Sequence, residues 1–286
     1  MKENYFLTFI KGILMGIADI IPGVSGGTIA FITGIYARLV SGIKDVGAFI
    51  VSVPKNLKKK KLFSALFKLD FAFFIPLLFG IGIAFVSGAY FLSGFIDKYP
   101  AQVYSFFIGL ILSSAVLIFK KIESHKFNEI IFGIIGLATG IIISVIPATS
   151  SGVEPSLVFI FFLGMIALCA MILPGISGAY IVLMFGQLKF MYDVVVRDFL
   201  EKWPYLLMFG LGGIIGLLSF SRLLSYVLKK HNSKTLYLLT GLMIGAIVGP
   251  LRTTIFSLSE STLLVSFAFF VLGAIVVFVV EKFAKK

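Results

Sequence analysis

Cysteine and histidine are nearly absent from this chain, which contains one cysteine, Cys169, and two histidines, His125 and His231. A single cysteine excludes a framework of internal disulfides. The sequence contains no Cys/His cluster at the spacing of a metal site, so no metal or other cofactor is expected. Neither histidine falls in an apolar segment, which leaves no base for a buried serine and no nucleophile for phospho-histidine chemistry. We therefore expect neither enzymatic activity nor catalytic residues.

Acidic residues are also scarce, because Asp and Glu number 13 against 25 Lys and Arg, for a net charge of +12. Charged residues make up only 13% of the 286 residues, whereas apolar residues make up 59%. A soluble domain of this size does not bury that much apolar surface, so the composition indicates a polytopic protein of the membrane bilayer. In such a protein the basic excess reports topology, and no nucleic-acid partner is expected.

A Pro-Gly-broken apolar segment occurs twice, at 12–34 and 164–186, with nine of 23 positions identical at an offset of 152 residues. The repeat continues further along the chain, where the Phe-Gly pair ending at Gly80 resembles the pair ending at Gly210. Interrupted apolar segments in corresponding positions of two halves indicate the binding site of a transporter.

Each broken segment is expected to form a re-entrant hairpin, over 5–35 in the first half and 156–186 in the second. The arm that follows each break is too short to cross the bilayer, so the chain returns to the face from which it came. The predicted hairpin turns are Pro22-Gly23 and Pro174-Gly175.

Six further segments are long and apolar enough to cross roughly 30 Å of hydrocarbon. They are 71–91, 102–119, 127–147, 204–228, 236–253 and 263–281. The mixed, charged stretch after each hairpin, 36–49 or 187–201, is expected to lie along the membrane interface. The predicted fold is all-α, with two inverted repeats over 1–147 and 148–286. Each repeat comprises a re-entrant hairpin, an interfacial helix and three transmembrane helices.

The basic residues favour one orientation of this topology. With the N-terminus in the cytoplasm, 19 of the 25 Lys and Arg residues fall on the cytoplasmic side, five fall outside and Arg222 lies within a span. This asymmetry follows the positive-inside rule, so both termini are expected in the cytoplasm. A first hairpin that crossed the membrane fully would place the lysines of 55–61 outside, against the rule.

The second arm of each hairpin begins with small and hydroxyl-bearing residues. These candidate phosphate-binding residues are Ser25, Gly26, Gly27, Thr28, Ser177 and Gly178. A helix that starts inside the membrane has unpaired N–H groups and a partial positive charge at its start. Two such starts, arriving from opposite faces, form a site for an anion. The alternative is structural, since the same residues build a tight turn and let helices pack closely.

Three charged residues within or beside the apolar segments have open roles. Arg222 either binds an anion or extends its side chain to the lipid headgroups. Arg252 ends the next span on the opposite face, where it would collect an anion from outside. Asp19 lies inside the first hairpin and aligns with Met171 in the second. The three candidate roles of Asp19 are to carry a proton, to pair with an arginine and to cap the broken helix.

Segments 18–28, 173–178, 219–225 and 249–252 resemble those of the polyprenyl-phosphate translocase family, and the resemblance covers essentially the whole chain. The resemblance implies a transporter that returns undecaprenyl phosphate, the carrier lipid of bacterial cell-wall synthesis, from the outer to the inner leaflet of the cytoplasmic membrane. Its partner would be this polyprenyl phosphate. Because inward movement of an anion opposes an inside-negative potential, proton coupling through Asp19 is a further expectation.

The residues alone leave open a small-anion channel or exchanger that uses the same helix starts. A lateral, Phe-lined gap would favour a lipid substrate, whereas a closed, water-filled pore would favour a small anion. The sequence also leaves open the oligomeric state, the coupling ion and the preferred prenyl chain length.

Overall fold

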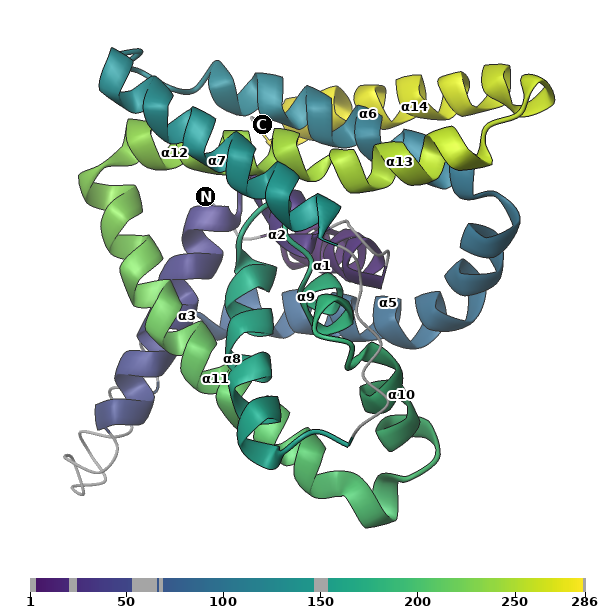
Figure 1. Cartoon of the computed structure of the whole chain (residues 1–286). Coiled ribbons are helices and arrows are strands. Elements are labelled where there is room, and N and C mark those ends of the chain that lie inside the picture. Colours follow the sequence, from purple (N-terminus) through teal and green to yellow (C-terminus); the bar gives the residue numbers. More distant parts are fainter. Residues whose placement is uncertain (1–3, 21–24, 53–65, 67–68, 147–153, 285–286) are drawn as a thin grey trace.

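The computed structural model of the chain describes residues 4–20, 25–52, 66, 69–146 and 154–284. Within these ranges the chain forms thirteen α-helices and no strand (Figure 1). The first half contains α1 (Tyr5–Ile20), α2 (Gly26–Ile32), α3 (Tyr36–Ser52), α5 (Phe71–Lys98), α6 (Pro100–Phe119) and α7 (Phe127–Val145). The second contains α8 (Leu157–Ile172), α9 (Gly178–Met184), α10 (Leu188–Val196), α11 (Phe199–Lys230), α12 (Asn232–Ala246), α13 (Val248–Ser257) and α14 (Glu260–Ala284). The prediction of an all-α polytopic protein is confirmed.

Among the described residues, five spans are long and apolar enough to cross a membrane, formed by α6, α7, α11, the α12–α13 pair and α14. The remaining predicted span, 71–91, lies inside the 28-residue helix α5. Of the α6 span 67% is buried, against 17% of the α7 and α14 spans. Helices α7 and α14 therefore present apolar side chains outward, as lipid-facing helices do.

Helix α11 begins earlier than the predicted span 204–228. It starts at Phe199 and continues through Pro204, with a non-helical residue at Lys202 (φ −114°, ψ 15°). The distortion two residues before the proline accommodates the missing N–H and the bulky ring, so the chain stays helical on both sides. As a consequence α10 covers only part of the predicted interfacial stretch 187–201.

The chain is not helical at the second predicted turn, because Pro174 and Gly175 lie between α8 and α9. Gly175 has a φ of +89°, a left-handed conformation that residues with a Cβ atom rarely adopt. In the first half, α1 and α2 flank the predicted turn, whose residues Pro22 and Gly23 lie outside the described residues.

A sharp bend follows each short second arm. The axes of α2 and α3 differ by 120°, and those of α9 and α10 differ by 111°. The helices α3 and α10 thus leave the second arms at a steep angle, which is the geometry expected of helices along an interface. The inverted relation of the two halves stays a prediction.

Corresponding helices pack in the same way in both halves. Helix α1 packs along α5 and α8 along α11, whereas α6 packs along α14 and α12 along α7, between the halves. In Figure 1 the helices α6, α7, α12, α13 and α14 form one layer at the top, and α8 and α11 lie below it at a steep angle to it. The α2 arm contacts α1, α3, α6, α8 and α14. A broken segment therefore occupies the centre of the molecule.

Glycines lie where the paired helices touch. A Cβ atom added at Gly12 or Gly80 would collide with backbone across the α1–α5 contact, and one at Gly164 or Gly212 would do so across the α8–α11 contact. Small residues let helices approach to backbone contact, as in many membrane proteins. The predicted counterpart of Gly80, Gly210, has no atom within 4 Å of its Cβ position. Gly212 occupies the equivalent contact instead.

Candidate functional site

The two broken segments contact each other where their second arms begin. The Ser25 hydroxyl donates to the carbonyl oxygens of Met171, at 3.4 Å, and Leu173, at 3.3 Å. The Gly175 N–H donates to Thr28 Oγ1 at 2.9 Å. Ser25 and Thr28 are fully buried, so their hydroxyls bind the first hairpin to the turn of the second. We call these five residues the hairpin junction.

The first N–H groups of α2 already have acceptors within the protein. The Gly26 N–H donates to Asp19 Oδ1 at 2.6 Å, and the Gly27 N–H donates to Ser25 Oγ at 3.1 Å. The Thr28 N–H donates to the Ser25 carbonyl at 3.0 Å. These are the groups expected to hold a phosphate. In this conformation an anion reaches them only after the Asp19 carboxylate and the Ser25 hydroxyl have moved away.

Asp19 caps the second arm of the first hairpin, which is one of its three expected roles. No ion pair to Asp19 is present among the described residues, and Lys11 on the same helix donates instead to the Thr33 carbonyl at 2.9 Å. The carboxylate also lies where a Cβ atom of residue 26 would be, so Gly26 makes room for the cap. A proton-carrying role for Asp19 stays a prediction.

Close packing also requires glycine at two other positions of the predicted phosphate site. A Cβ atom at Gly27 would lie 2.6 Å from the Ile172 carbonyl oxygen, and one at Gly178 would lie 2.8 Å from the Ala167 carbonyl oxygen. The structural alternative for these Ser-Gly motifs therefore accounts for their geometry in this conformation.

The second arm of the other hairpin leads to a cavity. Ser177 caps α9 by accepting from the Tyr180 N–H at 3.4 Å. The Tyr180 hydroxyl donates to the carbonyl oxygens of Ser144, at 3.3 Å, and Ile146, at 3.2 Å. These bonds connect α9 to the end of α7, and Tyr180 forms part of a cavity wall at this point.

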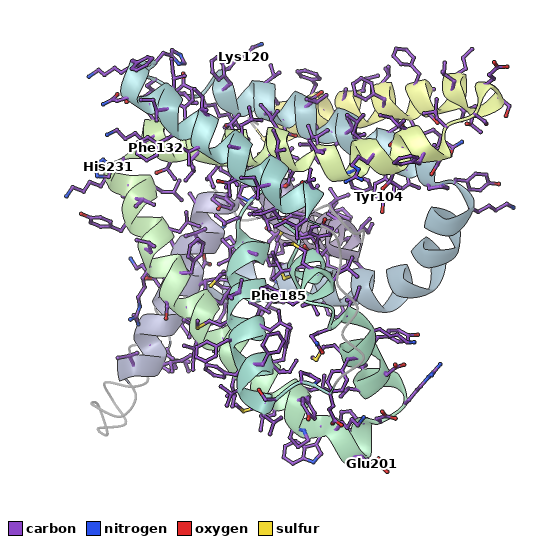
Figure 2. The ribbon with its side chains drawn as sticks, in the orientation of Figure 1. Tyr104, Lys120, Phe132, Phe185, Glu201 and His231 are labelled. Atoms are coloured by element: carbon purple, nitrogen blue, oxygen red, sulfur yellow. The ribbon has the colours of Figure 1, made fainter. Side chains whose placement is uncertain are left out.

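This cavity, which we call the Arg252 cavity, has a volume of about 380 Å³. It is lined by residues of α6, α7, α9 and α13, namely Tyr104, Ser144, Tyr180, Leu183, Gly249, Pro250, Arg252, Thr253 and Phe256. Figure 2 shows Tyr104 between the layer of α6 and α13 and the α9 arm. Arg252 carries the only charge among these lining residues. The cavity therefore presents one cation and two tyrosines, which suits an anion.

Arg222 does not line the Arg252 cavity. Its side chain is exposed on α11, on the side that packs against α3, and its Nη2 atom is 3.7 Å from the Cβ position of Gly47. Of the two arginines predicted to bind phosphate, Arg252 lines a cavity beside a hairpin, whereas Arg222 lies on the α3 side of α11. The position of Arg222 favours its alternative role, in which an exposed guanidinium extends toward the headgroups.

Sequence reasoning did not identify Tyr104 and Ser144 as site residues. Tyr104 is the only tyrosine in the predicted span 102–119, and Ser144 interrupts an otherwise apolar run. Polar side chains within a span are a signal for a buried polar cavity, because an unpaired hydroxyl is costly in lipid.

The fold and the cavity define the class: a multi-pass helical membrane protein whose helices break inside the fold, beside a cationic cavity. A family model described as undecaprenyl phosphate translocase-like matches residues 15–265. The chain belongs to this family.

Two curated relatives are similar over most of their length. A polyprenyl-phosphate transporter of Vibrio cholerae is 39% identical over 257 residues, which are 88% of this chain and 80% of the relative. A polyprenyl-phosphate transporter of Staphylococcus aureus is 29% identical over 261 residues, which are 86% of each chain. No solved structure matches the chain.

Proposed function

We propose that this protein transports a polyprenyl phosphate, undecaprenyl phosphate in particular, from the outer to the inner leaflet of the bacterial cytoplasmic membrane. Family membership and the names of two relatives support the substrate class. The apolar, outward-facing spans support a multi-pass location. In this proposal the protein is a transporter rather than an enzyme, and both of its termini are cytoplasmic.

The observation that carries the mechanism is the position of Arg252. A guanidinium binds phosphate through two parallel N–H donors, which few other side chains provide. Arg252 presents this group in a cavity whose wall includes Tyr180, on the second arm of the second hairpin. In this mechanism the phosphate first binds at Arg252. It then moves along α9, from Tyr180 toward the hairpin junction.

A polar route is necessary because an isolated phosphate in hydrocarbon costs on the order of tens of kcal/mol. The prenyl tail needs no such route, since lipid is already its preferred environment. Most of the tail therefore stays in the bilayer while the headgroup crosses near the hairpin junction. For that step the Asp19 carboxylate leaves the Gly26 N–H, which frees a donor for the phosphate.

Inward transport of an anion opposes an inside-negative potential by about 2.3 kcal/mol per charge per 100 mV. A proton that moves with the phosphate offsets one negative charge. Asp19 is the proposed carrier, because it lies in the first hairpin and contacts an N–H group expected to bind phosphate. Protonation weakens the carboxylate as an acceptor and so favours its release from Gly26.

Arg252→Gln tests this mechanism in proteoliposomes that contain the purified protein. Loss of a charge-assisted hydrogen bond costs about 1.5–3 kcal/mol, so the affinity for undecaprenyl phosphate should fall about 10- to 150-fold. Arg197→Gln is the matched control, because Arg197 is exposed at the end of α10 and has 72% of its side-chain surface accessible. Transport is measured as protection of a labelled prenyl phosphate from an external phosphatase.

The expected result is slow transport by the Arg252 variant and normal transport by the Arg197 variant. Equal transport by both variants would show that the Arg252 cavity does not bind the headgroup. Transport of chloride or free phosphate, with no transport of the lipid, would instead favour the small-anion alternative.

A further inference from the structure

A groove with a volume of about 480 Å³ lies between α7, α11 and α12. It is larger than the Arg252 cavity. We call it the α11–α12 groove. Its lining is apolar along most of its length and includes Phe132, Leu173, Phe220 and Leu223. The polar lining residues are His231, Lys234 and Thr235, all near the α11–α12 connection. The groove therefore has apolar walls and one polar end.

The polar end carries positive charge. Lys234 Nζ lies 5.6 Å from the centre of the Phe132 ring, and His231 is the residue between α11 and α12. Figure 2 shows Phe132 and His231 at this same end of the molecule. The acid that faces Lys234 is Glu129, whose carboxylate accepts the Lys126 N–H at 3.0 Å. With Lys126 and Lys234 together outweighing Glu129, this end attracts an anionic headgroup.

The opposite end of the groove reaches the hairpin junction. Leu173 lines the groove, and its carbonyl oxygen accepts the Ser25 hydroxyl at 3.3 Å. The next residue is Pro174, in the turn of the second hairpin. The groove thus connects the element that breaks inside the fold with a basic surface at the α11–α12 connection.

We propose that the α11–α12 groove binds the headgroup-proximal isoprene units of a polyprenyl phosphate, with the phosphate beside Lys234 and His231. The proposal rests on the proposed function and adds a second site to it. A cationic end next to continuous apolar walls matches a lipid with one small anionic head and a single apolar chain. Phe132 and Phe220 lie on the apolar walls, and a long apolar wall beside a cation suits a lipid better than a small anion.

The groove volume sets how much of the chain it holds. At roughly 30 Å³ for a water-sized group, 480 Å³ accommodates about 16 carbon-sized groups, or about three isoprene units. Affinity should therefore rise with chain length up to about three isoprene units and then level off. The predicted topology places Lys234 on the cytoplasmic side and Arg252 outside, so the groove is the site from which the carried lipid leaves.

Leu223→Trp tests the tail site by filling the groove. Leu223 is 57% exposed, so the larger ring enters the groove without disturbing the core. Leu207→Trp is the matched control, because Leu207 lies on the same helix, is 48% exposed and does not line the groove. Affinity for geranyl phosphate, farnesyl phosphate and undecaprenyl phosphate is measured by native mass spectrometry of the full chain. Leu223→Trp should lower the affinity for farnesyl phosphate by about fivefold or more, because less apolar surface is buried.

Lys234→Gln tests the headgroup end. The wild-type protein should bind farnesyl phosphate more tightly than farnesol. In the variant the ratio of these two affinities should fall about tenfold, because a charge-assisted contact is gone. Its affinity for farnesol should be unchanged. A variant that loses affinity for both lipids equally would place the phosphate elsewhere.

Two results would overturn the groove assignment while leaving the proposed function intact. One is normal farnesyl phosphate binding by Leu223→Trp in a protein that still transports undecaprenyl phosphate. The other is displacement of farnesyl phosphate by phosphatidylglycerol as effectively as by undecaprenyl phosphate, which would make the groove a general lipid contact. Absence of undecaprenyl phosphate transport by the wild-type protein would instead contradict the proposed function itself.

Discussion

At the scale of single residues, the polar groups of the hairpin junction satisfy one another. Ser25 and Thr28 are fully buried and bonded to the second hairpin, while Asp19 accepts from Gly26. An unsatisfied buried donor costs about 1–3 kcal/mol, so this closed arrangement is the stable one without substrate. In the proposed mechanism a phosphate takes the place of Asp19 and Ser25 as acceptor for the Gly26 and Gly27 N–H groups. These two N–H groups would then have an acceptor within the protein before the substrate binds, and the phosphate as acceptor afterwards.

Asp19→Asn separates the two roles of this carboxylate. An asparagine keeps an oxygen that accepts the Gly26 N–H but carries no titratable proton. We expect the variant to fold and to bind undecaprenyl phosphate, and its transport in proteoliposomes to lose the stimulation by a pH gradient. Asp19→Ala removes the cap as well and should lower the free energy of unfolding by about 0.5–2 kcal/mol.

Parallel measurements of thermal unfolding in detergent and of transport at two pH gradients distinguish these effects. A pH response that survives in Asp19→Asn would leave Asp19 as a structural cap and place the coupling elsewhere.

At the scale of elements, glycines determine which helices pair. The backbone contacts at Gly80 and Gly212 join α5 to α1 and α11 to α8, and a side chain at either position would separate the helices. In lipid, helices associate through such packing rather than through the hydrophobic effect, so the cost of an added methyl group is not offset by burial.

Gly212→Ala and Gly210→Ala form a matched pair on one helix. The Gly212 Cβ position collides with the Phe161 carbonyl, whereas that of Gly210 has no atom within 4 Å. Gly212→Ala should destabilise the protein by about 1–3 kcal/mol through overpacking. Gly210→Ala should be neutral or stabilise by about 0.5–1 kcal/mol, since alanine favours the helix. The readout is the midpoint of thermal unfolding, and equal shifts in both variants would contradict the assigned helix contact.

The sequence predicted the elements better than it predicted their partners. The apolar spans follow from the local composition of the chain. The break before α9 follows from two adjacent residues, Pro174 and Gly175. Both features depend on neighbouring residues in the sequence, so the sequence predicts them. Helix α11 begins before the predicted span 204–228, since Pro204 is accommodated by a distortion at Lys202 that depends on packing. The sequence also matched Gly210 to Gly80 because both follow a phenylalanine. In the structure the glycine of α11 that contacts the α8 backbone is Gly212.

The candidate site was less predictable for the same reason. The sequence predicted Ser25, Thr28 and Arg252 as site residues by residue type and position in the repeat. It gave no means to see that the first two already bond to the other hairpin, because those partners lie about 146 residues away in the chain. It also predicted Arg222 as a site residue, whose position on the α3 side follows only from the rotation of α11 in the fold.

At the scale of the whole molecule, two cavities with different linings lie beside the second hairpin. The Arg252 cavity is bounded by α9 and α13, and the α11–α12 groove reaches Leu173. Transport of a headgroup between them requires that they face opposite leaflets. That requirement depends on the inversion of the two halves, which the pairing of α6 with α14 and of α12 with α7 does not itself determine.

Labelling of single cysteines tests the inversion directly. Lys121 lies between α6 and α7, and Glu260 begins α14 after the corresponding connection in the second half; both are exposed. In a chain with Cys169→Ala, Glu260→Cys should react with a membrane-impermeant maleimide in intact cells. Lys121→Cys should react only after permeabilisation, because inverted repeats place equivalent connections on opposite sides. Labelling of both cysteines from one side would contradict the inversion and the two-sided route that depends on it.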